Sequence, residues 1–271
     1  MRNILIFLSK YNSLFVFIIL ELICLNLIIN YNNRQKEIFL YSSNLFSAYV
    51  LKEYNKYLDY INLTDINKKL KEDNASLIEN YFNRKYREIP LYTNSDSIVD
   101  IYSVIPAGIC NKSIDKRNNR ITIDRGSAAG VRKGMGVLDA KGIVGVVNMV
   151  NKNYASIIPL NNTVSRTSVI VKNKEYFGIL KWDPYDYRRS TLTTIPKHAN
   201  VAVGDSIITS GFSTIYPKGI FVGKIEKINT EQGSSYLNIT VKLINDLTLI
   251  QNVYIIDNKS KNERLELENQ L

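Results

Sequence analysis

Histidine and cysteine are scarce in this chain, and their scarcity argues against most metal and thiol chemistry. One histidine, His198, and two cysteines, Cys24 and Cys110, occur in 271 residues. A structural zinc site takes four Cys or His ligands at short spacings, and no such cluster is present in the sequence. Cys24 lies in an apolar run, so it cannot easily meet Cys110 in a disulfide. We therefore predict no metal site, no cofactor and no disulfide framework.

The single histidine also limits acyl-transfer chemistry, because a Ser-His-Asp triad would have to be built around it. His198 follows a proline and a lysine in an expected loop. Ser210, in a Thr-Ser-Gly step, is the tempting nucleophile, but it lacks the Gly-x-Ser-x-Gly elbow. A turn hydroxyl that bonds to nearby backbone is the better interpretation of Ser210. We predict no catalytic residue and no enzymatic activity.

No block of basic residues is present, although 35 Lys+Arg against 25 Asp+Glu give a net charge of +10. Such an excess permits a nucleic-acid, membrane-surface or acidic-glycan partner. The lysines are scattered, so a solvated, mildly basic surface is the simpler interpretation, and we predict no nucleic-acid partner. Because 45% of the residues are hydrophobic, the chain can bury a core and is not disordered throughout.

One long apolar run is present, from Leu14 to Ile29. With flanking tyrosines at the interface it is long enough to span a membrane. A cleaved signal peptide is the alternative, but no small-x-small cleavage site follows the run. A short basic N-terminus before a first span commonly stays inside. We predict a cytoplasmic tail at 1–12 and a single-pass anchor at 13–31 in the inner membrane, with the bulk of the chain outside the cytoplasm.

Glu21 interrupts this apolar run. An acidic residue at the centre of a membrane helix costs about 3 kcal/mol. Two interpretations remain open for it. Either the carboxyl is protonated or hidden in a helix dimer, or it faces a polar group on another integral membrane protein.

Glycine and proline are absent between Ile38 and Tyr81, which predicts a helical stalk over residues 32–89. A phase slip near Thr64 leaves one long helix or two shorter ones open. A polar residue at a core position, such as Asn74, is typical of a coiled coil that sets its register. We therefore predict a homodimeric coiled coil. Its two heptad-like seams are Leu51, Tyr54, Leu58 and Ile61, then Leu70, Asn74, Leu77 and Tyr81.

Beyond Pro90, short apolar runs alternate with turn residues, which is typical of strands. Short strands at such close spacing favour barrels or a sandwich over a doubly wound sheet. The fold class is therefore mainly β, and the charged tail at 259–271 is expected to be frayed. The expected strands are Ile98–Val104, Arg120–Asp124, Gly136–Leu138, Ile143–Val150, Ser168–Val171, Phe177–Lys181, Ser190–Ile195, Ser206–Ser210, Ile220–Ile228, Tyr236–Leu243 and Val253–Asp257.

Two glycine-rich segments, 119–145 and 204–225, carry a family resemblance. Their glycines are interpreted as turns, since no P-loop Lys-Ser/Thr follows them. The chain resembles the MreC family of bacterial rod shape-determining proteins, the first segment matching the family's first barrel and the second its signature. Tyr216 stands where that pattern leads us to expect Phe. The signature positions are Gly126, Gly130, Gly142, Gly145, Gly204, Asp205, Thr209, Ser210, Gly211, Pro217, Gly219 and Gly223.

The resemblance implies two small six-stranded β-barrels, at 90–165 and 166–258, and leaves open whether C-terminal strands return to the first. It implies a non-enzymatic scaffold of the cell-wall elongation complex that recruits and biases peptidoglycan synthases. The implied partners are MreD and RodA in the membrane, a class B penicillin-binding transpeptidase outside it and the actin-like MreB inside. An anchored module for anionic glycan or lipid is the alternative, and it predicts salt-dependent binding.

Partner contacts are expected through exposed strand edges and apolar patches. One candidate is the segment of aromatic and basic residues from Trp182 to Arg189, and Glu21 is a candidate in the membrane. The alternative interpretation of this segment is a hairpin loop whose aromatic rings lie half buried against their own barrel. The candidate contacts within it are Trp182, Tyr185, Tyr187 and Arg188.

Overall fold

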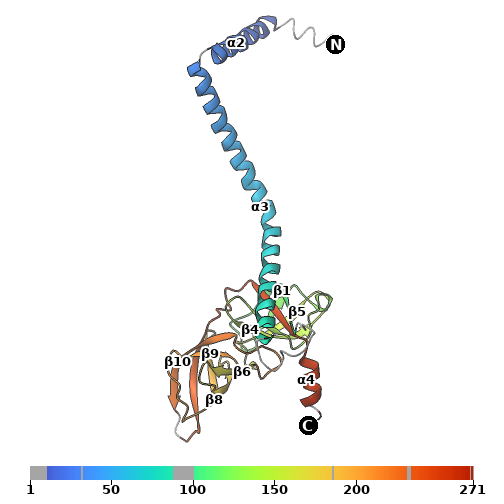
Figure 1. Ribbon diagram of the computed structural model, residues 1–271, viewed down its shortest axis with the longest axis vertical. Coiled ribbons are helices and arrows are strands. Elements are labelled where there is room, and N and C mark those ends of the chain that lie inside the picture. The colour runs from blue at the N-terminus through green and yellow to red at the C-terminus, as the bar shows by residue number, and fades with distance from the viewer. Residues whose placement is uncertain are drawn as a thin grey trace. The chain divides into compact units, whose positions relative to one another are not determined.

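The structure, a computed structural model, describes residues 11–31, 33–87, 101–184, 186–230, 233–268 and 270 (Figure 1). It divides into two compact units, Met1–Lys68 and Lys69–Leu271. The helices are α2 Asn12–Tyr31, α3 Asn33–Arg87, the 3-10 turn η2 Ser127–Ala129 and α4 Lys261–Glu268. The strands are β1 Tyr102–Lys112, β2 Ile121–Ile123, β3 Gly136–Leu138, β4 Ile143–Val150, β5 Ala155–Pro159, β6 Arg166–Val171, β7 Phe177–Lys181, β8 Arg189–Pro196, β9 Ser206–Thr209, β10 Phe221–Thr230, β11 Tyr236–Leu243 and β12 Asn252–Asn258.

The described part of the first unit is helical, as the N-terminal sequence predicts. Within the described residues, no helix is both long and apolar enough to cross a membrane. The anchor at 13–31 stays a prediction, and so does pairing of the stalk into a coiled coil. α3 runs without a break through Thr64, so the alternative of two shorter helices is wrong. Most of the predicted tail at 1–12 and the side chain of Ile61 lie outside the described residues.

The end of α3 is docked on the first barrel by a side chain that imitates a neighbouring strand. Asn83 is buried, its Nδ2 donates to the Tyr102 carbonyl at 2.9 Å, and its Oδ1 accepts from the Tyr102 amide at 2.9 Å. The Val104 amide donates to the Glu79 carboxylate at 3.0 Å. The Phe82 ring lies 6.1 Å from the Tyr102 ring. This end of the stalk is therefore held by both packing and polar contacts.

We expect Asn83→Ala to lower the free energy of unfolding by about 2 to 4 kcal/mol, because it leaves a buried amide and a buried carbonyl of Tyr102 without their partner. Urea denaturation followed by circular dichroism measures this loss. The matched control is Arg84→Ala on the next, exposed position of the same helix, which should cost less than about 0.5 kcal/mol. Equal losses in the two variants would contradict the strand-like role of Asn83.

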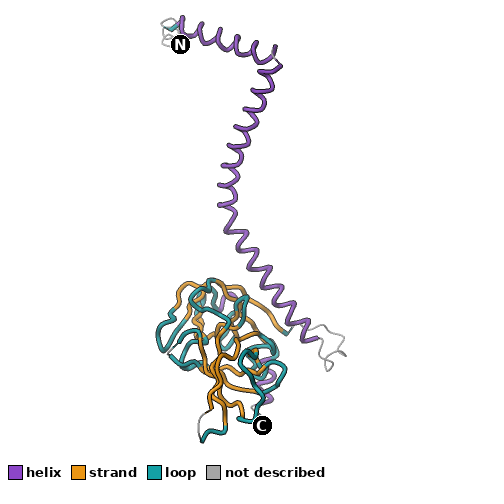
Figure 2. Tube along the Cα trace, turned by 90° about the vertical axis from the view of Figure 1, so that its left-hand side faces the viewer, coloured by secondary structure: helices purple, strands orange, loops and turns teal. Residues whose placement is uncertain are grey.

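The strands form two closed, antiparallel, six-stranded barrels, which confirms the predicted architecture. The first barrel has the order β1-β12-β3-β4-β5-β2 and the second β10-β11-β8-β7-β6-β9. Figure 2 shows these strands in orange. β12 pairs with β1 and β3, so the chain returns to the first barrel after completing the second. Closure gives every described barrel strand two neighbours, although part of a strand can pair on one side only, as at the start of β1.

Three elements differ from the sequence-based expectation. Residues 98–100 of the expected strand Ile98–Val104 lie outside the described residues, and β1 covers Tyr102–Lys112. At Pro106 this strand pairs with β12 alone, so the missing proline amide is tolerated on the other side. β5, Ala155–Pro159, is not among the expected strands, and it pairs with both β2 and β4. Residues 261–268 of the tail, which was expected to be frayed, form α4.

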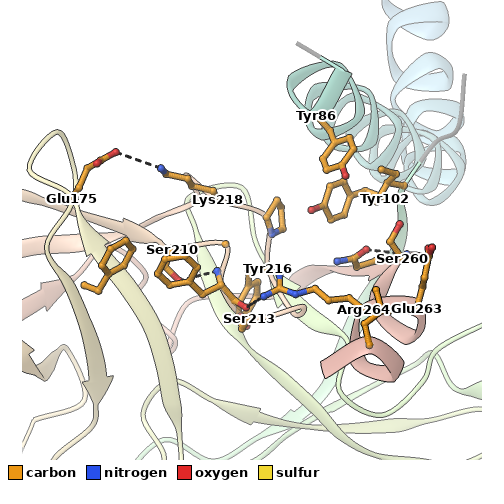
Figure 3. Close-up of a pocket in the computed structure, with 17 residues that line it drawn as sticks. Tyr86, Tyr102, Glu175, Ser210, Ser213, Tyr216, Lys218, Ser260, Glu263 and Arg264 are labelled. Atoms are coloured by element: carbon orange, nitrogen blue, oxygen red, sulfur yellow. Dashed lines mark hydrogen bonds and ion pairs between the residues drawn. The ribbon is translucent and has the colours of Figure 1, made fainter. Parts of the chain in front are cut away.

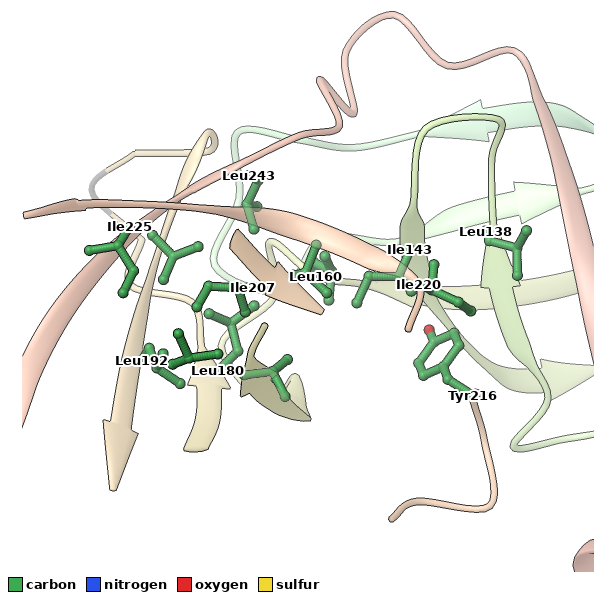
Figure 4. Packing of buried hydrophobic residues seen from close by; sticks show 14 of the residues in the cluster. Leu138, Ile143, Leu160, Leu180, Leu192, Ile207, Tyr216, Ile220, Ile225 and Leu243 are labelled. Carbon is green, nitrogen blue, oxygen red and sulfur yellow. The ribbon is translucent and has the colours of Figure 1, made fainter. Parts of the chain in front are cut away.

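Two apolar clusters hold the barrels together. One fills the first barrel, and the other runs from the end of α3 through the seam between the barrels into the second barrel. Figure 4 shows Leu138, Ile143 and Leu160 of the first barrel in the same cluster as Ile207 of the second. At the seam a Cβ on Gly142 would lie 2.2 Å from the Phe221 carbonyl oxygen, so the two barrels approach to backbone contact.

Candidate functional site

The signature segment forms a loop that is closed at its neck by one threonine. The Thr209 hydroxyl donates to the Pro217 carbonyl at 2.6 Å and accepts from the Ile220 amide at 2.9 Å. The Gly219 amide donates to the Thr209 carbonyl at 3.0 Å. Gly211 and Gly219 adopt φ values of +78° and +100°, which other L-residues rarely reach. These residues therefore shape the loop at 210–219, here called the signature loop.

The remaining signature residues also support the backbone. Ser210 Oγ lies 2.8 Å from Ser168 Oγ and accepts from the Phe212 amide at 3.2 Å, which agrees with a turn hydroxyl. Asp205 accepts from the Ala202 amide at 2.8 Å and pairs with Lys174 at 2.7 Å. Tight turns or close backbone approaches account for Gly126, Gly130, Gly142, Gly145, Gly204 and Gly223.

Tyr216 carries the signature loop of the second barrel onto the first barrel. Its side chain is 4% exposed, and its ring lies where a Cβ on Gly136 would be 2.6 Å away. Its hydroxyl donates to the Gly145 carbonyl of β4. Burial raises the pKa of Tyr216, so the hydroxyl stays protonated and keeps donating. The hydroxyl that distinguishes this residue from the expected Phe therefore bonds across the seam.

A groove of about 760 Å³ lies beside the signature loop (Figure 3). It is bounded by the last turn of α3, the start of β1, the start of β7, the signature loop and α4. All of these belong to the second unit. Its aromatic lining comes from Tyr86, Tyr102, Phe177, Phe212 and Tyr216.

Two of these rings face solvent and contact each other. Phe177 is 44% exposed and Phe212 56% exposed, and their ring centroids lie 4.3 Å apart. Exposed aromatic pairs in a concave surface are typical of protein interfaces, where such rings supply much of the binding energy. The groove is therefore better suited to an apolar partner segment than to solvent.

The charges of the groove balance. Its described lining has two cations, Lys218 and Arg264, and two anions, Glu175 and Glu263. Lys218 Nζ lies 3.9 Å from the Glu175 carboxylate, and the Arg264 guanidinium donates to the Phe212 carbonyl at 2.9 Å. The groove is thus close to neutral although the whole chain carries +10.

The segment 182–189, where partner contacts are also expected, lies outside this groove, and its role as a contact stays a prediction. Trp182 is 7% exposed and donates to the Asp186 carbonyl at 2.8 Å. The Arg188 guanidinium lies 5.2 Å from the Tyr187 ring and pairs with Asp246 at 2.8 Å. This is the hairpin loop packed on its own barrel, and none of its described side chains lines the groove. Tyr185 lies outside the described residues, and Glu21 is exposed on α2 in the first unit.

Sequence reasoning missed the aromatic pair. Phe177 and Ile179 occupy the outward positions of β7, where alternation leads one to expect polar residues. Phe212 directly follows Gly211 in the signature loop. Apolar residues at the outward positions of a strand could therefore have been noticed in the sequence. That Phe177 lies beside Phe212 is known only from the tertiary structure.

Carboxylates around Arg189 tie the 182–189 hairpin to β10. The Glu226 carboxylate accepts from the Arg189 guanidinium at 2.5 and 2.9 Å, and this pairing holds the pKa of Glu226 below its usual range. The pKa of Asp186 is also lowered, first by a hydrogen bond from the Arg188 amide and second by one from the Arg189 side chain. Hydrogen bonds from Thr248 lower the pKa of Asp246.

These lowered pKa values predict acid destabilisation. A carboxylate whose folded pKa is depressed stabilises the fold above its unfolded pKa of about 4, and that contribution disappears as pH falls through the folded pKa. The urea midpoint should therefore change little between pH 7 and pH 5 and fall below about pH 4. Asp186→Asn with Glu226→Gln should flatten this dependence. If the urea midpoint of the double variant falls with pH as steeply as that of wild-type, Asp186 and Glu226 do not cause the acid destabilisation.

No catalytic constellation is evident in the described part of the chain. His198 is exposed, and the Ser210 hydroxyl bonds to Ser168 and the Phe212 amide. Among the described residues, no three His, Cys, Asp or Glu side chains are grouped to hold a metal ion. What the described site offers is a shaped aromatic surface.

Comparison with known proteins identifies a family whose model matches more than half of this chain. Residues 109–257 match a family model described as rod shape-determining protein MreC, barrel core. The cell shape-determining protein MreC of Listeria monocytogenes is 30% identical over 141 residues, covering 51% of this chain and 48% of the relative. That of Bacillus subtilis is 26% identical over 166 residues, covering 58% and 57%. The chain thus spans about half the length of the curated relatives it matches.

Solved structures agree in fold. An MreC structure from Listeria monocytogenes aligns with a TM-score of 0.55 at 25% identity, covering 84% of this chain and 96% of that one. The crystal structure of MreC from Pseudomonas aeruginosa aligns with a TM-score of 0.53 at 23% identity, covering 56% and 98%. At 23% identity, the similarity to the Pseudomonas aeruginosa structure supports the fold only.

Proposed function

This chain belongs to the MreC family of rod shape-determining proteins, and from that premise we propose that it is a non-enzymatic, membrane-anchored scaffold of the cell-wall elongation complex. It controls cell shape by recruiting peptidoglycan synthases and biasing their conformation. Residues 13–31 anchor it in the inner membrane by a single pass, and the barrels lie outside the cytoplasm. The stalk pairs two copies into a homodimer.

The partners in this proposal occupy three places. MreD and RodA lie in the membrane, where Glu21 offers a polar contact. The actin-like MreB lies inside the cell. A class B penicillin-binding transpeptidase lies outside and docks in the groove. The main support for the proposal is the exposed pair of Phe177 and Phe212 in that groove. Exposed apolar side chains that are grouped in this way mark protein interaction sites.

The charge balance of the groove bears on the alternative function. A module for anionic glycan or lipid needs a surplus of cations where its ligand binds. The described lining of the groove instead has as many anions, Glu175 and Glu263, as cations, Lys218 and Arg264. An apolar protein segment therefore fits this surface better than an anionic polymer.

Affinity purification of the full chain from membranes, with amine crosslinking, tests the proposal. We expect the transpeptidase, MreD and RodA to co-purify, and crosslinks from Lys218 at the groove to reach the transpeptidase. Recovery of none of these proteins would refute the scaffold. Salt-sensitive binding to anionic vesicles or purified peptidoglycan, without protein partners, would favour the alternative.

A further inference from the structure

The described side chains of α4 do not belong to the core, yet three of them line the groove. Its described side chains are exposed, except for the partly buried Lys261. Glu263, Arg264 and Leu267 of this helix nevertheless belong to the groove lining. Leu267 is 62% exposed, so an apolar side chain stands at the groove without a covering neighbour. α4 therefore contributes surface to the groove rather than packing to the barrels.

Polar contacts hold α4 in place between the two barrels. Lys261 Nζ donates to the Gly134 carbonyl of the first barrel at 3.1 Å. The Arg264 guanidinium donates to the Phe212 carbonyl of the signature loop at 2.9 Å. A helix of eight residues is marginal by itself in water, so contacts of this kind are what keep it helical. One of them fixes the backbone of Phe212, half of the aromatic pair.

We propose that α4 is a wall of the partner-binding groove, with Leu267 as a contact residue and Arg264 as a positioning residue for Phe212. The occupant is an apolar, uncharged peptide segment of the partner protein. This proposal rests on the proposed function, and it assigns a binding role to the C-terminal tail.

The lining itself argues for this occupant. Leu267 on α4 and Phe212 on the signature loop are exposed apolar side chains on the walls of one groove. The charged lining side chains of α4 are one anion and one cation, so the wall adds no net charge. A neutral apolar segment meets both conditions, because it covers the apolar walls and leaves no charge uncompensated.

The test compares two leucines of one helix. Leu267 lines the groove, whereas Leu265, two residues earlier, does not. The full chain in nanodiscs is titrated with the purified class B penicillin-binding transpeptidase of the same cell, and Kd is measured. We expect Leu267→Ala to weaken binding about 3- to 10-fold and Leu265→Ala to stay within about 2-fold.

Truncation and a positioning variant complete the design. A chain ending at Ser260 should bind about 10-fold or more weakly, with Tm unchanged within about 2 °C, because none of the α4 side chains that the structure describes is in the core. Arg264→Lys should retain more binding than Arg264→Ala, since an ammonium can still donate to the Phe212 carbonyl. Equal Kd values for these two variants would remove the positioning role.

The outcomes separate the two proposals. If the wild-type chain does not bind the transpeptidase, the proposed function fails and this inference falls with it. If wild-type binds and loses affinity when Phe212 is replaced, but the truncated chain binds as well as wild-type or better, only the role of α4 is overturned.

Discussion

Replacing Phe177 and Phe212 together by serine should weaken binding of the class B transpeptidase by about 100-fold or more, since exposed aromatic anchors carry most of the energy of such interfaces. The rings are 44% and 56% exposed, so the barrels lose little packing when they are removed. Titration of the full chain in nanodiscs measures the affinity, and the urea midpoint reports that the fold is retained. Rod-shaped cells that depend on the variant should become round.

The matched control removes apolar surface elsewhere. Val164 and Val203 are exposed valines outside the groove. Their double replacement by serine should leave the affinity within about 2-fold, because isolated surface residues contribute little. If the two double variants bind alike, the aromatic pair is not the docking surface and the groove loses its assigned role.

Tyr216→Ala should lower the free energy of unfolding by about 3 to 5 kcal/mol, the usual cost of deleting a buried aromatic ring. The ring fills the space beside Gly136, and its hydroxyl reaches the Gly145 carbonyl in the other barrel. Tyr216→Phe keeps the ring and loses only the hydroxyl, so it should cost about 1 to 3 kcal/mol. Urea denaturation resolves this series.

A surface tyrosine provides the control for the hydroxyl. Tyr236 is 52% exposed on β11, and Tyr236→Phe should change stability by less than about 0.5 kcal/mol. If Tyr216→Phe costs no more than this control, the contact with Gly145 contributes nothing to the seam. A Tyr216→Ala variant within 1 kcal/mol of wild-type would show that the seam does not depend on this ring at all.

Local chemistry accounts for the parts of the fold that were predicted correctly. Alternating apolar residues and turn-forming glycines are properties of short segments, so strands such as β6 and β7 could be located from the sequence. β1 was displaced because Pro106 is read locally as a strand breaker, whereas the fold leaves that position with one neighbour. β5 was missed because its two partners, β2 and β4, supply the support that its own five residues lack.

The candidate docking groove could not be located from the sequence in this way. The 182–189 segment is a candidate for partner contacts because aromatic and basic residues are adjacent in its sequence, but the barrel buries Trp182. Phe177, Phe212 and Leu267 are far apart in the chain, and none is conspicuous alone. Barrel closure and the placement of α4 bring them to one groove.

By itself, the sequence determined that this chain is a helical segment followed by a β-rich body with few residues suited to catalysis or metal binding, because composition and periodicity act over neighbouring residues. Only the tertiary structure decided which apolar side chains stay uncovered. Exposure depends on packing between segments distant in the chain, so Phe212 is exposed and Tyr216, four residues later, is buried in the opposite barrel.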